Sequence, residues 1–163
     1  MNNLRYKYKY KNIQGCDINT CEISINDSYC CLNPYFIGGA RNTENTAAIK
    51  IECNNVTIDL NNHSISQSKL FACEQRIYSI IELNRRVFTN SGDKFQPGPQ
   101  IEQPGCSNIT IKNGIIGRTS HFGIHGTNTN MLFVKDVNFI DFEVAGIWIN
   151  NASMCHIDNC NLS

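Results

Sequence analysis

Residues 109–117 have the sequence Ile-Thr-Ile-Lys-Asn-Gly-Ile-Ile-Gly, and 23 positions later residues 132–140 follow a similar pattern, Leu-Phe-Val-Lys-Asp-Val-Asn-Phe-Ile. Five columns of the sequence keep this period of 23 residues. They are Ile101, Ile124 and Ile147; Ile111, Val134 and Ile157; Ile116, Phe139 and Leu162; Asn113, Asp136 and Asn159; and Gly123 with Gly146. A fixed period of this length is typical of proteins built from structural repeats.

The repeats have the pattern and the composition of β-strands. Apolar and polar residues alternate in Ile109-Thr-Ile111 and in Val56-Thr-Ile58, which indicates strands with one buried face. Val, Ile, Thr and Phe dominate while Asn and Gly interrupt the segments, which disfavours helices. Three short strands in each unit would close a coil that pairs with the coils above and below it. We therefore predict an all-β right-handed parallel β-helix, a solenoid with rungs of about 23 residues.

The polar column of Asn113, Asp136 and Asn159 is expected to lie at a turn of this solenoid. Asn and Asp tolerate a left-handed backbone, and stacked side chains of this kind can hydrogen-bond along the solenoid axis. A ligand site is the alternative interpretation, and we favour the structural ladder.

The chain is expected to have three parts: a basic arm rich in Tyr and Lys at 1–12, an irregular N-terminal capping segment at 13–46, and the β-helix at 47–163. Cys53-Asn-Asn-Val-Thr-Ile matches Cys106-Ser-Asn-Ile-Thr-Ile, which places a rung before the periodic region. A strand is expected at 78–83. A Pro-Gly-Pro segment indicates a surface loop near 84–100.

The length of 163 residues suits one domain, and the formal net charge is zero. No apolar run reaches the roughly 18 residues that a membrane span needs, and the polar start lacks the apolar stretch of a secretory signal. We therefore expect a soluble protein with no membrane partner. Its expected location is the virion or the host cytoplasm if the chain is viral, and otherwise the cytoplasm.

The chain has nine cysteines, an odd number, so at least one thiol stays unpaired within the monomer. Disulfides also require an oxidising compartment, and the sequence has no secretory signal that would indicate one. A zinc site is disfavoured because the two closest matches have C-x4-C spacing in place of paired C-x2-C knuckles. We expect Cys53, Cys106, Cys155 and Cys160 to fill interior positions as small apolar side chains. No metal and no cofactor is predicted.

Three segments carry a family resemblance: Ser28-Tyr-Cys-Cys-Leu32, Ala48-Ile-Lys-Ile51 and Asn55-Val-Thr-Ile-Asp-Leu-Asn-Asn-His-Ser-Ile65. Together with the period, they resemble right-handed β-helix proteins of the pectin-lyase-like superfamily, particularly those encoded in multiple copies by giant DNA viruses. The resemblance covers roughly residues 20–163. It implies architecture more than chemistry, because one fold hosts many functions.

Pectinolytic members of that superfamily cleave acidic polysaccharides with clustered Asp residues, or with Asp-bound calcium and an Arg base. Glycoside hydrolysis needs two carboxylates about 5 to 10 Å apart on one groove. The nearby candidates are Asp136, Asp141 and Asp158, and turn duty explains the first and the last of them. The Asn-x-Asp, Asp-Asp and Arg-x-Lys motifs of the polygalacturonase-like branch are absent, so no catalytic residue is predicted.

The best polar pair in the chain is His121 and His125, which flank Gly123. Residues four apart in a strand point to the same side, so both imidazoles are expected to face solvent. Trp148 lies one period after His125 and is expected beside it on the outward face. Such a patch could grip a sugar or a protein partner. Packing under a loop or against another subunit is the simpler reading.

The first segment alternates strictly, with Tyr6, Tyr8 and Tyr10 on one side and Arg5, Lys7, Lys9 and Lys11 on the other. Such an arm could bind nucleic acid weakly, through phosphate contacts and base stacking. An acidic neighbouring subunit is as good a partner, and nucleic acid is not our preferred one.

The last rung stops at Asn161-Leu-Ser163 without a helix or polar cap, although solenoids need caps at their ends. Either the chain is cut from something longer or an assembly covers this edge. We therefore expect self-association, with a homotrimer as the first prediction. The expected function is a non-enzymatic structural or interaction protein, a viral scaffold or virion-associated component. The alternative is a carbohydrate-binding or polysaccharide-degrading β-helix.

Overall fold

The computed structural model describes residues 11–13, 21–24, 29–31, 47–51, 53–73, 79–83 and 105–163. The elements within these residues are β1 (Lys11–Ile13), β2 (Cys21–Ser24), β3 (Tyr29–Cys31), β4 (Ala47–Ile51), β5 (Val56–Asp59), β6 (Ser64–Gln67), α1 (Lys69–Ala72), β7 (Ser79–Glu82), β8 (Ser107–Thr119), β9 (Phe122–Thr127), β10 (Asn130–Phe142), β11 (Ala145–Asn150), β12 (Ser153–Asp158) and β13 (Asn161–Leu162). The expected loop near 84–100 lies outside the described residues, as does most of the expected arm and capping segment.

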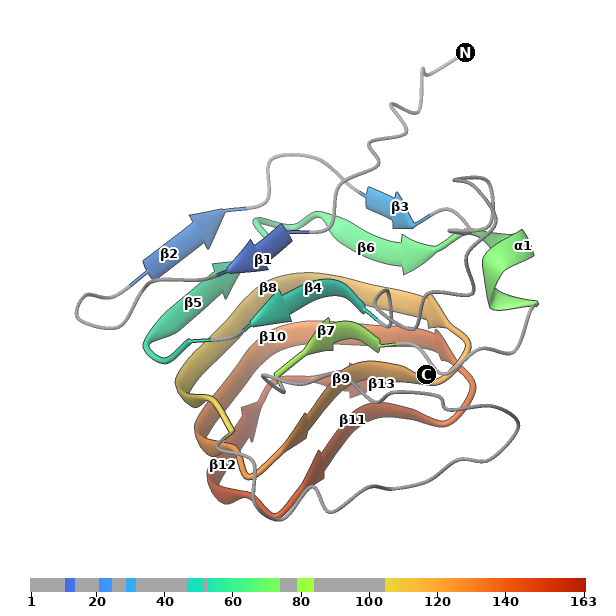
Figure 1. Ribbon diagram of the computed structural model, residues 1–163. Helices are drawn as coiled ribbons and strands as arrows, with labels where there is room; N and C mark the ends of the chain where they lie inside the picture. The colour runs from blue at the N-terminus through green and yellow to red at the C-terminus, as the bar shows by residue number, and fades with distance from the viewer. Residues whose placement is uncertain are drawn as a thin grey trace.

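The strands form two sheets in which every pairing is parallel. Sheet A has the order β1-β4-β7-β9-β11, and sheet B has the order β12-β10-β8-β5-β2, with β3, β6 and β13 joined to it. Figure 1 shows the stack running from β1, β2 and β3 at one end to β11 and β12 at the other. The expected all-β fold with parallel strands is thereby confirmed.

Strand register confirms the period found in the sequence. The predicted columns pair in the sheets as Ile111–Val134–Ile157, Ile116–Phe139–Leu162 and Ile124–Ile147. The earlier match is also correct, because Val56 pairs with Ile109 and Ile58 with Ile111. In parallel strands an equal sequence offset keeps equivalent side chains in one ladder. Ile101 lies outside the described residues.

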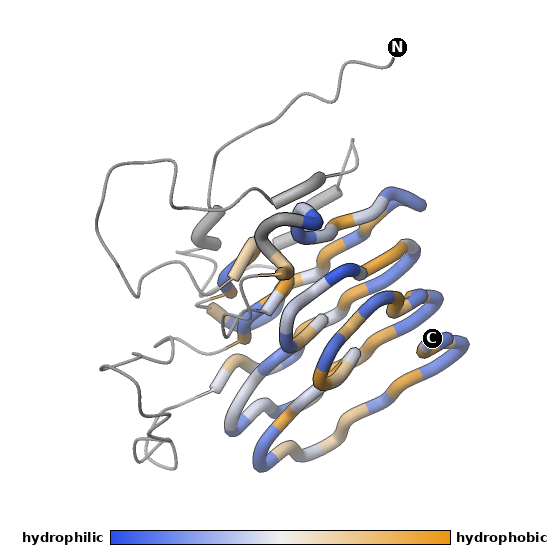
Figure 2. The backbone as a smooth tube through the Cα atoms, turned by 90° about the vertical axis from the view of Figure 1, so that its right-hand side faces the viewer, coloured by the Kyte–Doolittle hydropathy of each residue, from blue (hydrophilic) through white to orange (hydrophobic). Residues whose placement is uncertain are grey.

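The core lies between the two sheets and is almost wholly aliphatic. Its fully buried apolar side chains include Ile51, Ile58, Ile65, Ile81, Ile109, Ile111, Ile116, Ile124, Leu132, Val134 and Phe139. Figure 2 shows apolar and polar residues alternating along the strands, as expected for strands with one buried face.

Phe139 is the largest fully buried side chain, and two glycines leave room for it. A Cβ added at Gly123 would lie 2.9 Å from Cδ1 of Phe139, and one added at Gly146 would lie 3.0 Å from its Cβ. Both distances are shorter than van der Waals contact allows. The Gly123–Gly146 column therefore lets sheet A approach the aromatic ring carried by sheet B.

The polar column forms the expected ladder at a bend in the long strands. Asn113, Asp136 and Asn159 have φ angles of 60°, 55° and 47°, in the left-handed region that Asn and Asp tolerate best. Asn159 donates a side-chain hydrogen bond to Asp136 one repeat earlier. The structural interpretation of this column is confirmed.

Asp59 extends the ladder toward the earlier strands. The Asn113 amide donates to its two carboxylate oxygens at 3.0 and 3.1 Å, and Lys112 Nζ lies 3.4 Å away. Desolvation raises the pKa of Asp59, but hydrogen bonds from the Asn61 backbone, Asn113 and Lys112, with the lysine charge, outweigh it and leave this pKa below its ordinary value. The interactions of the Asp59 carboxylate therefore stabilise the folded state at a pH above the ordinary pKa of Asp. This stabilisation is lost as the pH falls through the lowered pKa of Asp59.

A second left-handed column changes residue type partway along the stack. Asn55, Asn108, Met131 and Met154 have φ angles of 59°, 55°, 57° and 53°. The Asn108 amide donates to the Asn55 side-chain oxygen at 2.9 Å. Methionine has no amide group to donate such a bond. A side chain other than that of Asn or Asp adopts this backbone at a cost of roughly 1 kcal/mol.

Met131→Asn should therefore raise the free energy of unfolding by about 1 kcal/mol, because the left-handed backbone is relieved and the Asn55–Asn108 ladder gains a member. The midpoint of urea unfolding measures this change. Met131→Ala, which also removes the thioether but cannot hydrogen-bond, is the control and should not stabilise. Equal midpoints for the two variants would contradict the ladder.

Candidate functional site

A row of polar and aromatic side chains crosses sheet A. Strand register places four residues in one ladder across β4, β7, β9 and β11: Lys50, Glu82, His125 and Trp148. The adjacent ladder contains the core residues Ile81 and Ile124. Since neighbouring residues of a strand point to opposite faces, this row lies on the outer face of sheet A. We call it the outer row.

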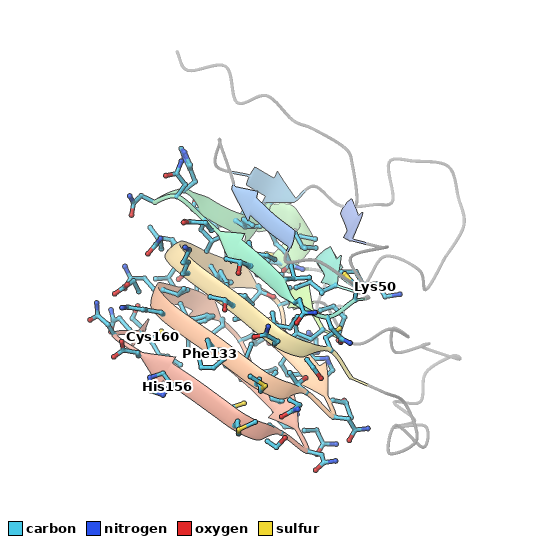
Figure 3. The ribbon with its side chains drawn as sticks, turned by 90° about the vertical axis from the view of Figure 1, so that its left-hand side faces the viewer. Lys50, Phe133, His156 and Cys160 are labelled. Carbon is cyan, nitrogen blue, oxygen red and sulfur yellow. The ribbon has the colours of Figure 1, made fainter. Side chains whose placement is uncertain are left out.

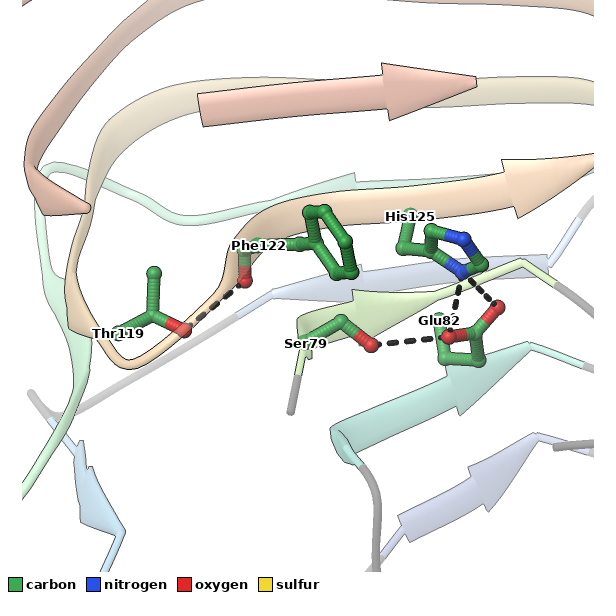
Figure 4. Close-up of polar contacts among 5 residues, drawn as sticks. All are labelled: Ser79, Glu82, Thr119, Phe122 and His125. Carbon is green, nitrogen blue, oxygen red and sulfur yellow. Dashed lines mark hydrogen bonds and ion pairs between the residues drawn. The ribbon is translucent and has the colours of Figure 1, made fainter. Parts of the chain in front are cut away.

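The centre of the outer row is a buried hydrogen-bonded pair of His125 and Glu82 (Figure 4). Nδ1 of His125 lies 2.9 and 3.0 Å from the two carboxylate oxygens of Glu82, and the Ser79 hydroxyl donates to the same carboxylate at 2.9 Å. Each of the three residues is 2% exposed. A carboxylate only accepts hydrogen bonds, so Nδ1 carries the proton that it shares with Glu82.

The expectation that His125 faces solvent is therefore wrong. β9 lies between β7 and β11, and all six of its residues are buried, so its outer face is covered as well as its inner one. His121 is half-buried. His121 and His125 therefore do not form a solvent-exposed pair, because His125 is buried and hydrogen-bonded to Glu82.

Phe122 connects the aromatic groups of this region. Its ring centroid lies 4.9 Å from that of His125 in a stacked arrangement, 5.4 Å from that of Trp148, and 5.8 Å from that of His121 in an edge contact. Phe122 itself is buried, whereas Trp148 is 49% exposed. Trp148 is thus paired in register with His125, as expected, and it is the exposed member of the outer row, in which Lys50 is half-buried.

The carboxylates considered for catalysis do not form a reaction centre with the outer row. Asp136 accepts a hydrogen bond from Asn159 in the turn ladder, and Asp158 lies 4.0 Å from Lys135 across β10 and β12. Asp141 is exposed, with a left-handed φ of 51° at the end of β10. In the described part of the chain, no group of three or more His, Cys, Asp or Glu side chains could hold a metal ion.

The cysteines divide between the core and the last repeat. Cys53 and Cys106 are buried as expected, and the Cys106 thiol lies 3.2 Å from the Ile51 carbonyl oxygen. Cys155 is exposed and Cys160 is half-buried, so the expectation of interior positions is wrong for Cys155. Desolvation nevertheless raises the pKa of the Cys155 thiol, which disfavours the reactive thiolate.

The exposure of the last repeat defines a second surface, which we call the end surface: Cys155, Ile157, Cys160 and Leu162. Ile157 is 52% exposed although Val134, its partner one repeat earlier, is fully buried. Leu162 is 54% exposed although Phe139 is fully buried. These side chains occupy core columns, but among the described strands none lies beyond β12 and β13 to pack on them.

The outer face of sheet B carries an aromatic pair on its last two long strands, β10 and β12. Figure 3 shows Phe133 and His156 on the neighbouring strands β10 and β12, with Cys160 close to the last strand. The ring centroids of Phe133 and His156 lie 6.3 Å apart. His156 is exposed, and it lies between Cys155 and Ile157 along β12, so its side chain faces away from the core columns.

The remaining predicted binding residues, Tyr6, Tyr8, Tyr10, Lys7 and Lys9, lie outside the described residues. None of the helices in the described segments has the length and apolar character needed to cross a membrane. The described chain is thus nearly all β, with two sheets of parallel strands. No family model, curated protein or solved structure matches it.

Sequence reasoning missed Glu82 as the partner of His125. The two residues are 43 positions apart, which is not a multiple of the 23-residue period. A signal was present, because Glu82 is the one acidic residue in the strand expected at 78–83. A carboxylate in an apolar strand calls for a partner on the neighbouring strand.

Proposed function

We propose that this chain is a right-handed parallel β-helix and that it serves as a non-enzymatic structural or interaction protein that associates with copies of itself. Parallel pairing in both sheets and equivalent positions 23 residues apart support the β-helix. A scaffold or virion component of the pectin-lyase-like type is the role that the resemblance implies. Such a role requires surfaces rather than a reaction centre.

The observation that carries the proposal is the exposure of core columns at the end surface. Ile157 and Leu162 each leave about half of the side chain in water. Burying that half contributes on the order of 1 kcal/mol for each residue. The edge strands β11 and β12 also present backbone hydrogen-bonding groups to whatever packs there. Apolar columns flanked by strand edges favour a β-sheet partner.

A second copy of this chain is the occupant that fits these features. Its own strands have the spacing and the column pattern that the end surface continues, since each described repeat packs on the next in the same register. A globular partner without a matching strand edge would cover the apolar side chains but leave the strand edges unpaired. Self-association satisfies both requirements at once.

Ile157→Lys should convert an oligomer into a monomer, because it places a charge in the apolar centre of the contact. The measurement is solution mass by light scattering over a wide range of concentrations, in reducing buffer. His156→Lys is the matched control, since it puts the same charge on the same strand facing away from the core columns, and it should keep the oligomer. The number of copies also tests the predicted homotrimer.

A wild-type chain that remains a monomer of 18.4 kDa at every concentration would overturn the proposal. The second candidate would then be carbohydrate binding on the outer face of sheet A. It is favoured by the exposed Trp148, whose ring stands over Phe122 at the edge of the buried Glu82–His125 pair. Flat aromatic surfaces of this kind bind sugar faces at low entropic cost.

A further inference from the structure

Two buried cysteines occupy one column, just before the paired strands β5 and β8 of sheet B. Val56 pairs with Ile109, and the same offset of 53 residues leads from Cys53 to Cys106. Cys53 is 1% exposed and Cys106 is fully buried, and both are thiols in the structure. We propose that oxidation joins Cys53 and Cys106 in a disulfide that links β5 to β8, which Figure 1 shows side by side.

Hydrogen bonds hold the two chain segments in register next to the cysteines. The Asn55 backbone N–H donates to the Ser107 carbonyl oxygen at 3.0 Å, and the Ser107 N–H donates to the Asn54 side-chain oxygen at 2.9 Å. Asn55 and Asn108 also share a left-handed backbone, with φ angles of 59° and 55°. The two segments therefore leave the cysteines in the same conformation, and the Cα atoms of the cysteines are expected at the usual strand spacing of about 4.8 Å.

This spacing suits a disulfide, because bridged cysteines have Cα atoms roughly 4.4 to 6.8 Å apart. The Cys106 side chain already reaches toward the segment that contains Cys53. Its Sγ lies 3.2 Å from the carbonyl oxygen of Ile51, two residues before Cys53. Bond formation then requires a change of side-chain rotamer rather than a large shift of the backbone.

The position of the pair along the chain gives the bond a large effect. A cross-link stabilises a protein more when the chain between its ends is longer. β8 and β10 pair at an offset of 23 residues, whereas β5 and β8 pair at 53, the largest offset among the described strand pairs. The segment between the two cysteines includes β7, which brings Glu82 to His125. The disulfide therefore fixes two neighbouring strands across the connection that costs the most chain entropy to close.

The oxidant in this reaction is a small disulfide such as oxidised glutathione. One protein thiolate attacks a sulfur of the reagent and releases one reduced glutathione, and the second protein thiolate then attacks the mixed disulfide and releases another. Two protein thiols become one disulfide, and their two protons end on the two glutathione molecules released. Since both cysteines are buried, the exchange takes place while the chain folds or when these strands open locally.

Peptide mapping of the wild-type chain tests whether the bond forms. The protein is incubated with oxidised and reduced glutathione at a urea concentration just below its unfolding transition, where strands open and close again. The remaining thiols are then alkylated, and trypsin is added. The tryptic peptides 51–69 and 95–112 each contain one cysteine, Cys53 and Cys106 respectively. We expect mass spectrometry to detect these two peptides joined. Either cysteine alkylated throughout, or bonded to another partner, would overturn the proposal.

Urea unfolding tests what the bond does. The equilibrium constant for unfolding should be at least about 30-fold lower for the oxidised chain than for the reduced chain, an effect typical of disulfides. Cys53→Ala should abolish this difference, and alanine suits the column because Ala152 occupies it two repeats after Cys106. Cys73→Ser, which removes an exposed thiol, is the matched control and should keep the difference. Equal stability of the oxidised and reduced wild-type chain would overturn the stabilising role.

Discussion

His125→Ala should lower the free energy of unfolding by about 3 kcal/mol, because it empties a buried site and removes a hydrogen-bond donor from the buried Glu82 carboxylate. The loss is large because the Glu82 side chain is 2% exposed and the His125 ring lies within hydrogen-bonding distance of both of its carboxylate oxygens. Removing a hydrogen-bond donor from a buried carboxylate costs more free energy than the packing that is lost with the imidazole. Urea unfolding followed by circular dichroism measures the change.

His156→Ala is the matched control, because it removes an imidazole from an exposed position on β12 and should change the free energy of unfolding by less than about 0.5 kcal/mol. A double variant, Glu82→Leu with His125→Phe, should recover most of the loss, since apolar side chains of similar size can replace a buried pair. If His125→Ala is as mild as His156→Ala, the pair is not buried in solution.

The parallel strand pairing could be predicted from the sequence, because residues one repeat period apart pair with each other when parallel strands stack in register. Ile111, Val134 and Ile157 recur every 23 residues and therefore fall in one ladder, whatever the turns between them do. The Asn113–Asp136–Asn159 column was predictable for a second reason, because few residue types adopt a left-handed backbone at low cost. The repeat period and the backbone preferences of single residues can both be read from the sequence without knowing how the strands pack.

The His125–Glu82 pair could not be predicted in the same way. It depends on burial of the outer face of sheet A and on which strand pairs with β9. Alternation correctly places His125 on the outer face of β9, but nothing in alternation reveals that this face is buried. The partner strand β7 precedes β9 by an offset outside the period, so register alone did not bring Glu82 to His125. Burial of an outer face is a tertiary property.

The same limit explains the cysteines. Cys106 and Cys155 both belong to strands of sheet B or their ends, and a small apolar side chain suits an interior column in either place. Cys106 has strands on both sides and is fully buried, whereas Cys155 is on the outermost described strand and is exposed. Position within the stack, and not residue type, decides burial, which is why the end surface became visible only in three dimensions.

Phe139→Ala should lower the free energy of unfolding by about 3–5 kcal/mol, the usual cost of deleting a buried aromatic ring. Phe139 is fully buried and packs in the column between Ile116 and Leu162. The backbone around it is set by glycines at 123 and 146 that approach the ring closely, so neighbouring strands cannot move inward without breaking sheet A. The cavity therefore stays open, and the cost should fall at the upper end of this range.

Phe133→Ala is the control within the same strand, since Phe133 lies on the outer face of β10 and is only half-buried. Its removal should cost less than half as much, because the ring loses fewer contacts and water can occupy its place. Urea unfolding of both variants gives the comparison. Equal losses would mean that β10 buries both faces in solution, which a partner docked on sheet B would explain. A much smaller loss at Phe139 would mean that the two sheets do not enclose a packed core.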